Sequence, residues 1–130
     1  MLDLTKLKSL ELPTAIVDIE IMGEKQAVKV TAPSDETALT IAELATLDLQ
    51  GTALTLAIAK VILSDCCADI TAEDADTLRE KAFASAVMPI MAKARELRIE
   101  FEKRVAEITE NNKKAQAQEQ NGAEPATAGN

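Results

Sequence analysis

The sequence predicts an α+β fold that is mostly α-helical: an N-terminal β-hairpin, a helical body of about four helices and a disordered C-terminal tail. Between residues 14 and 32, apolar and polar residues alternate, as in half-buried strands. Between residues 34 and 108, apolar residues recur every three or four positions, as on one face of a helix. From residue 111 onward the sequence has no leucine, isoleucine, valine, methionine or aromatic residue, so little surface can be buried to offset chain entropy. We therefore expect one globular domain over residues 1–110 and a disordered tail over residues 111–130.

The expected hairpin consists of two short strands, residues 14–22 and 26–32, joined through Gly23. In the first, "TAIVDIEIM", every second residue from Ala15 to Ile21 is apolar, and the two acids between them face the other way. In the second, "QAVKVTA", two valines flank a lysine. A two-stranded hairpin is marginally stable alone, so we expect it to pack on the helices or to pair with another chain.

Two helices are expected next. Pro33 ends the second strand, and Ser34 or Asp35 then caps a helix by accepting a hydrogen bond from a free backbone N–H. Gly51 marks either the C-terminal stop of this helix or a kink within a longer one. The following stretch, residues 52–65, is apolar on almost all sides, which is typical of a buried helix at the centre of a fold.

The stretch "SDCCADITAEDADTLRE" carries both cysteines and six acidic residues, so it is the first candidate for chemistry. Read as a calcium loop starting at Asp65, it lacks the glycine at the sixth position and the glutamate at the twelfth. Cys66 and Cys67 are adjacent, whereas redox and zinc motifs space their cysteines, so we expect these thiols to pack as small apolar residues. The acids fit a helix start, with Thr71 as N-cap and Asp74 in a capping box.

An apolar seam runs from Phe83 to Ile108 in steps of three and four residues, close to the repeat of a helix that packs against another helix. Two interpretations stay open: an amphipathic helix on the core of its own domain, or a surface for self-association or for a partner helix. Pro89 lies inside the seam, so we expect a kink or break near residues 86–89. Under the second interpretation the partner-binding residues are Phe83, Val87, Ile90, Leu97, Phe101 and Val105.

Composition argues against catalysis. The chain has no histidine, which excludes Ser-His-Asp and Cys-His nucleophiles as well as zinc sites that contain histidine. Its four glycines are isolated, so the sequence contains no glycine-rich phosphate-binding loop. We predict no catalytic residue, no metal and no cofactor, and therefore a protein that is not an enzyme.

Charge and hydropathy bear on partners and location. The chain has 22 acidic and 14 basic residues, and its net charge of −8 repels nucleic acid. The start "MLDLTKLKSLEL" has no apolar leader region, and the longest apolar stretch, residues 53–63, is too short to span a bilayer. We expect a cytoplasmic protein that binds neither nucleic acid nor membrane.

Two stretches, "IVDIEIMGEKQAVKVTAPSDETALTIAEL" and "IAKVILSDCCADITAEDADTLREKAF", resemble the tail assembly chaperones of long-tailed bacteriophages. That family combines an acidic composition, an N-terminal β-hairpin, a helical body and a soluble tail. The second stretch is similar to the family's passage from a helix through an acidic loop into a T-x-E-D-A-x-x-L helix start. Together the two stretches cover roughly half of the chain.

The resemblance implies a non-enzymatic protein of the host cytoplasm that binds the tape measure protein, keeps it soluble, helps to recruit tail tube subunits and is absent from the mature virion. It also implies a longer form made by ribosomal frameshifting, for which the codons of Lys113 and Lys114 are a candidate slippery site. Two other classes stay open: a small structural tail or head-completion subunit, and a helical adaptor or regulatory protein that forms a homo-oligomer through the seam.

Overall fold

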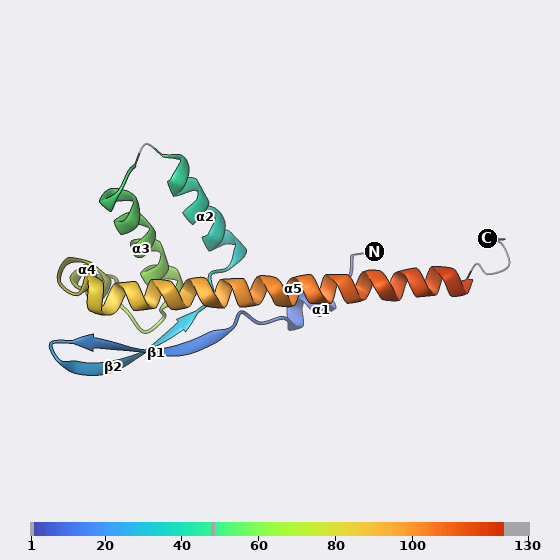
Figure 1. Ribbon diagram of the computed structural model, residues 1–130, viewed down its shortest axis with the longest axis horizontal. Coiled ribbons are helices and arrows are strands. Elements are labelled where there is room, and N and C mark those ends of the chain that lie inside the picture. Colours follow the sequence, from blue (N-terminus) through green and yellow to red (C-terminus); the bar gives the residue numbers. More distant parts are fainter. Residues whose placement is uncertain (1, 48, 124–130) are drawn as a thin grey trace.

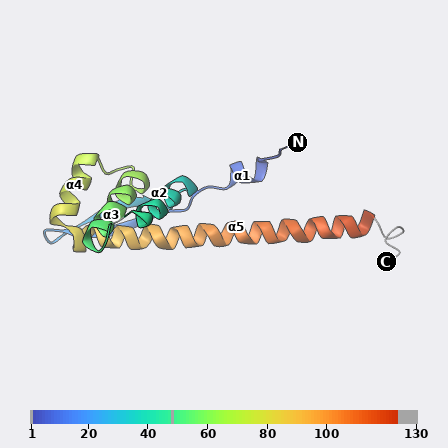
Figure 2. The same ribbon diagram turned by 90° about the horizontal axis from the view of Figure 1, so that it is seen from above.

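The computed structural model describes residues 2–47 and 49–123, with side chains described as far as residue 116. One long helix, α5 (Met88–Ala123), forms the axis of the molecule, and most of the other elements gather around its first half (Figure 1, Figure 2). The β-hairpin lies along one side of α5, and two helices stand on the opposite side (Figure 1). The described residues are α+β and mostly helical, with four helices after the hairpin, which confirms the predicted fold class.

Strands β1 (Thr14–Ile21) and β2 (Glu24–Thr31) form an antiparallel hairpin. The turn consists of only two residues, Met22 and Gly23, whose φ angles are 52° and 82°. Two left-handed residues in a row are typical of a type I′ turn, whose twist matches that of the strands. The hairpin is therefore confirmed, and its tight turn makes β2 begin two residues earlier than expected.

The core lies between the inner face of the hairpin and the first half of α5. Alternate strand residues point into it, and burial of their apolar surface holds an otherwise marginal hairpin in place. The hairpin thus packs on helices of its own chain, the first of the two expected arrangements. Buried members of the core include Val17, Ile19, Val28 and Val30 of the hairpin and Ile90, Ala94 and Leu97 of α5.

Helices α2 (Asp35–Thr46) and α3 (Thr52–Cys66) form a helical hairpin whose tip stands away from α5 (Figure 1). Fully buried residues of α3 begin at Ala59, and the first half of this helix is half-buried or exposed. The expectation that residues 52–65 form the central buried helix is therefore corrected in part: α5 takes the central place, and the second half of α3, from Ala59 onward, reaches the core.

Side-chain caps determine where two of the helices begin. The Ser34 hydroxyl accepts a hydrogen bond from the Thr37 N–H at 3.2 Å, and the Thr71 hydroxyl accepts one from the Asp74 N–H at 3.1 Å. Each cap satisfies a backbone donor that the first turn of a helix leaves free, as predicted for both sites. Gly51, with a φ of 57°, directly precedes α3, so it starts that helix instead of ending α2.

A π-helical turn, η1 (Phe83–Val87), joins α4 (Ala72–Lys81) to α5. Within it the Val87 N–H donates to the Ala82 carbonyl, five residues back, at 3.3 Å. Pro89 lacks an N–H and crowds the carbonyl one turn earlier, so a wider turn in front of it gives its ring room. The break predicted around this proline is confirmed and takes the form of the π turn.

Helix α5 continues beyond its expected end at residue 108 as far as Ala123, so the first part of the expected tail, residues 111–123, is helical. Lysine, alanine, glutamine and glutamate fill residues 113–120, and all four are strong helix formers. Adding them to a helix that is already formed avoids the cost of nucleation, so the helix continues without an apolar face. The rest of the expected tail, residues 124–130, lies outside the described residues.

A short helix, α1 (Thr5–Ser9), precedes the hairpin and lies beside the middle of α5 (Figure 1). The alternation of leucine and charge in this segment does not predict it. The Asp3 carboxylate accepts hydrogen bonds from the Thr5 hydroxyl at 2.6 Å and from the Thr5 N–H at 3.0 Å, which holds the start of the helix. The same bonds lower the pKa of the Asp3 carboxyl.

Candidate partner-binding surface

The six residues predicted for partner contact do not share one surface. Val87, Ile90 and Leu97 are at most 5% exposed and lie in the core of the domain. Phe83 is half-buried and packs against the same core. The prediction that Val87, Ile90 and Leu97 contact a partner is therefore corrected. The hairpin and the neighbouring helices already cover these three residues, and a partner would have to unfold the domain to reach them.

Phe101 and Val105 are half-buried and lie further along α5. Phe101 carries the guanidinium group of Arg98 over its ring, 5.4 Å from the ring centre. Ile108, also half-buried, continues the seam at the same spacing. We call Phe101, Val105 and Ile108 the distal seam; it is the part of the predicted surface that remains accessible to a partner.

The structure adds a second surface, an apolar groove of about 660 Å³ between the α2–α3 hairpin and α5, which we call the helical groove. Its walls come from three helices, and charged side chains stand at its edge. Such a groove suits a binding mode in which an amphipathic helix lays its apolar face between helices. The apolar lining includes Ala38, Ile41, Ile58, Ile62, Met91 and Ile99, and the charged lining consists of Arg95, Arg98 and Glu102.

Hydrogen bonds at the base of the α2–α3 hairpin hold the groove in shape. Arg98 of α5 donates to the Pro33 carbonyl at 2.9 Å and to the Asp35 carboxylate at 2.6 Å, at the start of α2. The Thr37 hydroxyl donates to the Asp65 carboxylate at 3.0 Å and so joins the start of α2 to the end of α3. The base of the hairpin is therefore fixed, while its tip stands away from α5 (Figure 1).

Arg98 keeps its charge in this setting. Burial alone disfavours the charged guanidinium, but hydrogen bonds to Asp35 and Glu102 outweigh it and raise the pKa of Arg98. Its side chain is 19% exposed, and the ring of Phe101 lies beneath it. One residue thus connects the start of α2, the edge of the groove and the distal seam.

The two cysteines lie in the core, as predicted, rather than at a reactive site. Cys66 and Cys67 are 2% and 1% exposed. Burial, aided by nearby negative charge, raises the pKa of the Cys66 thiol to about 12 and that of the Cys67 thiol to about 11. Both are therefore neutral thiols near pH 7, and a neutral thiol is a poor nucleophile. Among the described residues, no three Cys, Asp or Glu side chains gather closely enough to hold a metal ion.

The helical groove was not predicted from the sequence, because the α5 residues that line it lie beside the seam rather than on it. Met91, Arg95 and Ile99 form a second stripe on α5, spaced by four residues, and this stripe is visible in the sequence. Its opposite wall, with Ile41 and Ile58, is brought to it only by the α2–α3 hairpin. The periodicity of a single helix can therefore predict at most the half of the groove that this helix lines.

Within the part of the chain that the structure describes, no helix has both the length and the apolar character needed to cross a bilayer. Comparison of the chain with protein-family models, with curated proteins and with solved structures found no match. The function is accordingly inferred from the groove, the distal seam, the charge and the sequence resemblance.

Proposed function

We propose that the chain is a non-enzymatic assembly chaperone that binds amphipathic helices of a partner protein in the helical groove. The observation that supports this most is the groove itself, which has apolar walls from three helices and charged edges. A bound helix would bury its apolar face against these walls, and its polar flanks would remain hydrated at the edges. The hydrogen bonds of Arg98 and Thr37 hold such a site ready before the partner arrives.

The client follows from the resemblance to phage tail assembly chaperones: the tape measure protein, which is long, helical and prone to aggregate. In this proposal the chain keeps the tape measure protein soluble in the host cytoplasm, helps to recruit tail tube subunits and leaves before the virion matures. The net charge of −8 supports such a role, because it keeps a chaperone–client complex soluble and away from nucleic acid.

Co-expression tests the chaperone function. We expect the tape measure protein of the same phage to stay in the supernatant of a lysate when both proteins are made together, and to sediment when it is made alone. An unrelated acidic protein of similar size serves as the control and is expected to leave the client insoluble. If the client sediments equally with and without this chain, the chaperone function is wrong.

Mass spectrometry of mature particles separates this function from that of a structural subunit. The proposal predicts that the chain is absent from purified particles although it is abundant in the infected cell. A fixed number of copies in each particle would contradict the proposal and favour a structural tail or head-completion subunit.

A further inference from the structure

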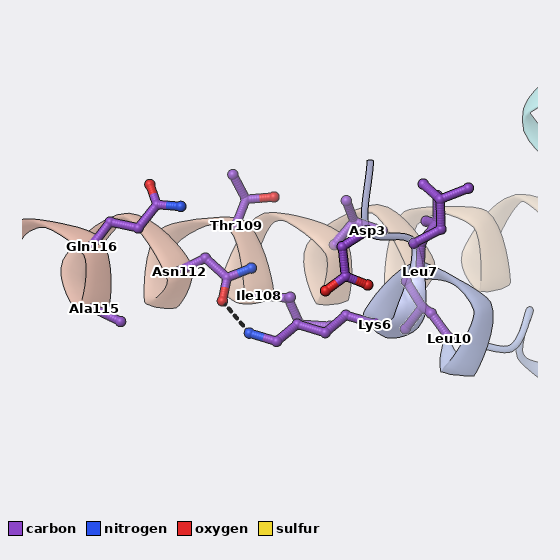
Figure 3. Close-up of a pocket in the computed structure, with 11 residues that line it drawn as sticks. Asp3, Lys6, Leu7, Leu10, Ile108, Thr109, Asn112, Ala115 and Gln116 are labelled. Atoms are coloured by element: carbon purple, nitrogen blue, oxygen red, sulfur yellow. Dashed lines mark hydrogen bonds between the residues drawn. The ribbon is translucent and has the colours of Figure 1, made fainter. Parts of the chain in front are cut away.

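The N-terminal segment of the chain lies over the distal seam. A cleft of about 550 Å³ is lined by three leucines of this segment, Leu4, Leu7 and Leu10, and by Val105 and Ile108 of α5. Figure 3 shows Leu7, Leu10 and Ile108 at this cleft. All five are apolar, and they come from opposite ends of the sequence. The middle of α5 is thus partly covered by a leucine-bearing segment of its own chain.

One polar contact links this segment to α5. The Lys6 ammonium group donates to the side-chain oxygen of Asn112 at 2.6 Å, across 106 positions of sequence (Figure 3). Asn112 follows Ile108 at a spacing of four residues, so it continues the line of the distal seam. An asparagine at the end of an apolar seam favours a partner that offers a polar group at one fixed place. The lysine of α1 is such a group.

The segment is held loosely. None of the five residues of α1 is buried, and Leu7 remains 61% exposed although it lines the cleft. A helix of one turn is too short to be stable without packing. A ligand that buries more apolar surface on the distal seam therefore displaces α1 at little cost.

We propose that the distal seam is a binding surface for an amphipathic helix of a partner, with leucines at spacings of three or four residues and a lysine placed to reach Asn112, and that α1 is its built-in competitor. The chemistry of the ligand follows from the segment that already sits there. The cleft at this surface lies further along α5 than the helical groove and shares no lining residue with it, so the inference does not rest on the function proposed for that groove.

Tethering explains how such a weak contact regulates binding. A segment joined by a short linker is present at its own site at an effective concentration of about 1 mM or more. It therefore excludes weak ligands and yields only to helices with larger apolar faces. The seam stays partly covered in the free chain, which limits aggregation, and becomes fully available to a partner that matches it.

An NMR titration of the full-length chain tests the proposal. The probe is a synthetic peptide of residues 1–12, "MLDLTKLKSLEL", added to the isotope-labelled chain. We expect it to bind the Leu7→Asp variant at least about tenfold more tightly than the natural chain, because the tethered competitor is weakened. The matched control is Leu2→Asp, since Leu2 is 82% exposed and does not line the cleft. The amide signals of Val105, Ile108 and Asn112 are expected to shift.

A second pair of variants assigns the site. In the Leu7→Asp background, Val105→Asp is expected to abolish peptide binding, whereas Ala106→Asp, on the exposed side of α5, keeps it. Equal affinity for the natural and Leu7→Asp chains, or signal shifts elsewhere than on residues 105–112, would overturn the proposal. Self-association of the Leu7→Asp chain that the peptide does not reverse would assign the seam to a second copy and overturn it too.

Discussion

Cys66 and Cys67 make the stability of the folded chain depend on pH in a defined window. Burial raises the pKa of their thiols to about 12 and about 11, whereas a cysteine thiol of the unfolded chain titrates near 9.0. Between about pH 9 and pH 11 the unfolded chain therefore binds fewer protons than the folded chain, so stability falls as the pH rises. Below this window both thiols are protonated in both states, and their contribution does not change with pH.

Urea unfolding at several pH values tests this linkage. We expect the free energy of unfolding to fall less steeply between about pH 9 and pH 11 in a Cys66→Ala/Cys67→Ala variant than in the natural chain. The variant is less stable at pH 7 because two core side chains are shortened. The two thiols no longer contribute to the change of its free energy of unfolding with pH. Contributions that are common to both proteins cancel in the comparison. If the free energies of unfolding of the two proteins fall in parallel over this pH range, the burial assigned to Cys66 and Cys67 is contradicted.

Single residues also show which structural features can be predicted from the sequence. Ser34 and Thr71 were predictable as caps because a cap involves a hydroxyl and a backbone N–H only three residues ahead. Val87 and Phe101 both fit the seam, yet the first is fully buried and the second half-buried. What separates them is the packing of other elements around each position, and periodicity within one helix carries no information about that packing.

At the scale of elements, the placement of the α2–α3 hairpin creates the helical groove. The hydrophobic pattern predicted both helices, but it did not predict their angle to α5. The contacts that set this angle join distant residues: Arg98 and Asp35 are 63 positions apart in the sequence. By contrast, the β-hairpin and the break before Pro89 depend on neighbouring residues, and both were predictable.

Removal of the Arg98 side chain tests how this hairpin is held. Arg98→Ala loses the hydrogen bonds to Pro33 and Asp35, so we expect a loss of about 1–3 kcal/mol in the free energy of unfolding. Hydrogen exchange is expected to become faster in α2, whose start loses its anchor on α5.

The matched control is Arg104→Ala on the same helix. Arg104 approaches Glu100 only at 3.9 Å and is half exposed, so its removal is expected to change stability by less than about 0.5 kcal/mol. If both variants behave alike, Arg98 does not hold the hairpin.

At the scale of the whole molecule, a small body sits on one half of a long helix. The 36 residues of α5 extend about 54 Å at 1.5 Å per residue. The helical groove lies at the body, and the distal seam lies further along the same helix. Two apolar surfaces are therefore arranged along one axis, which suits a client that is itself a long helical chain.

Affinity for the tape measure protein, measured by calorimetry with matched variants of this chain, tests the central claim most directly. Ile99 lies in the helical groove and is 48% exposed, whereas Leu39 lies outside it and is 65% exposed, so either change to aspartate leaves the core intact. Our account predicts that Ile99→Asp weakens binding at least about tenfold, because a charge enters the apolar site, and that Leu39→Asp binds like the natural chain. Full binding by Ile99→Asp, or an equal loss in both variants, would contradict it.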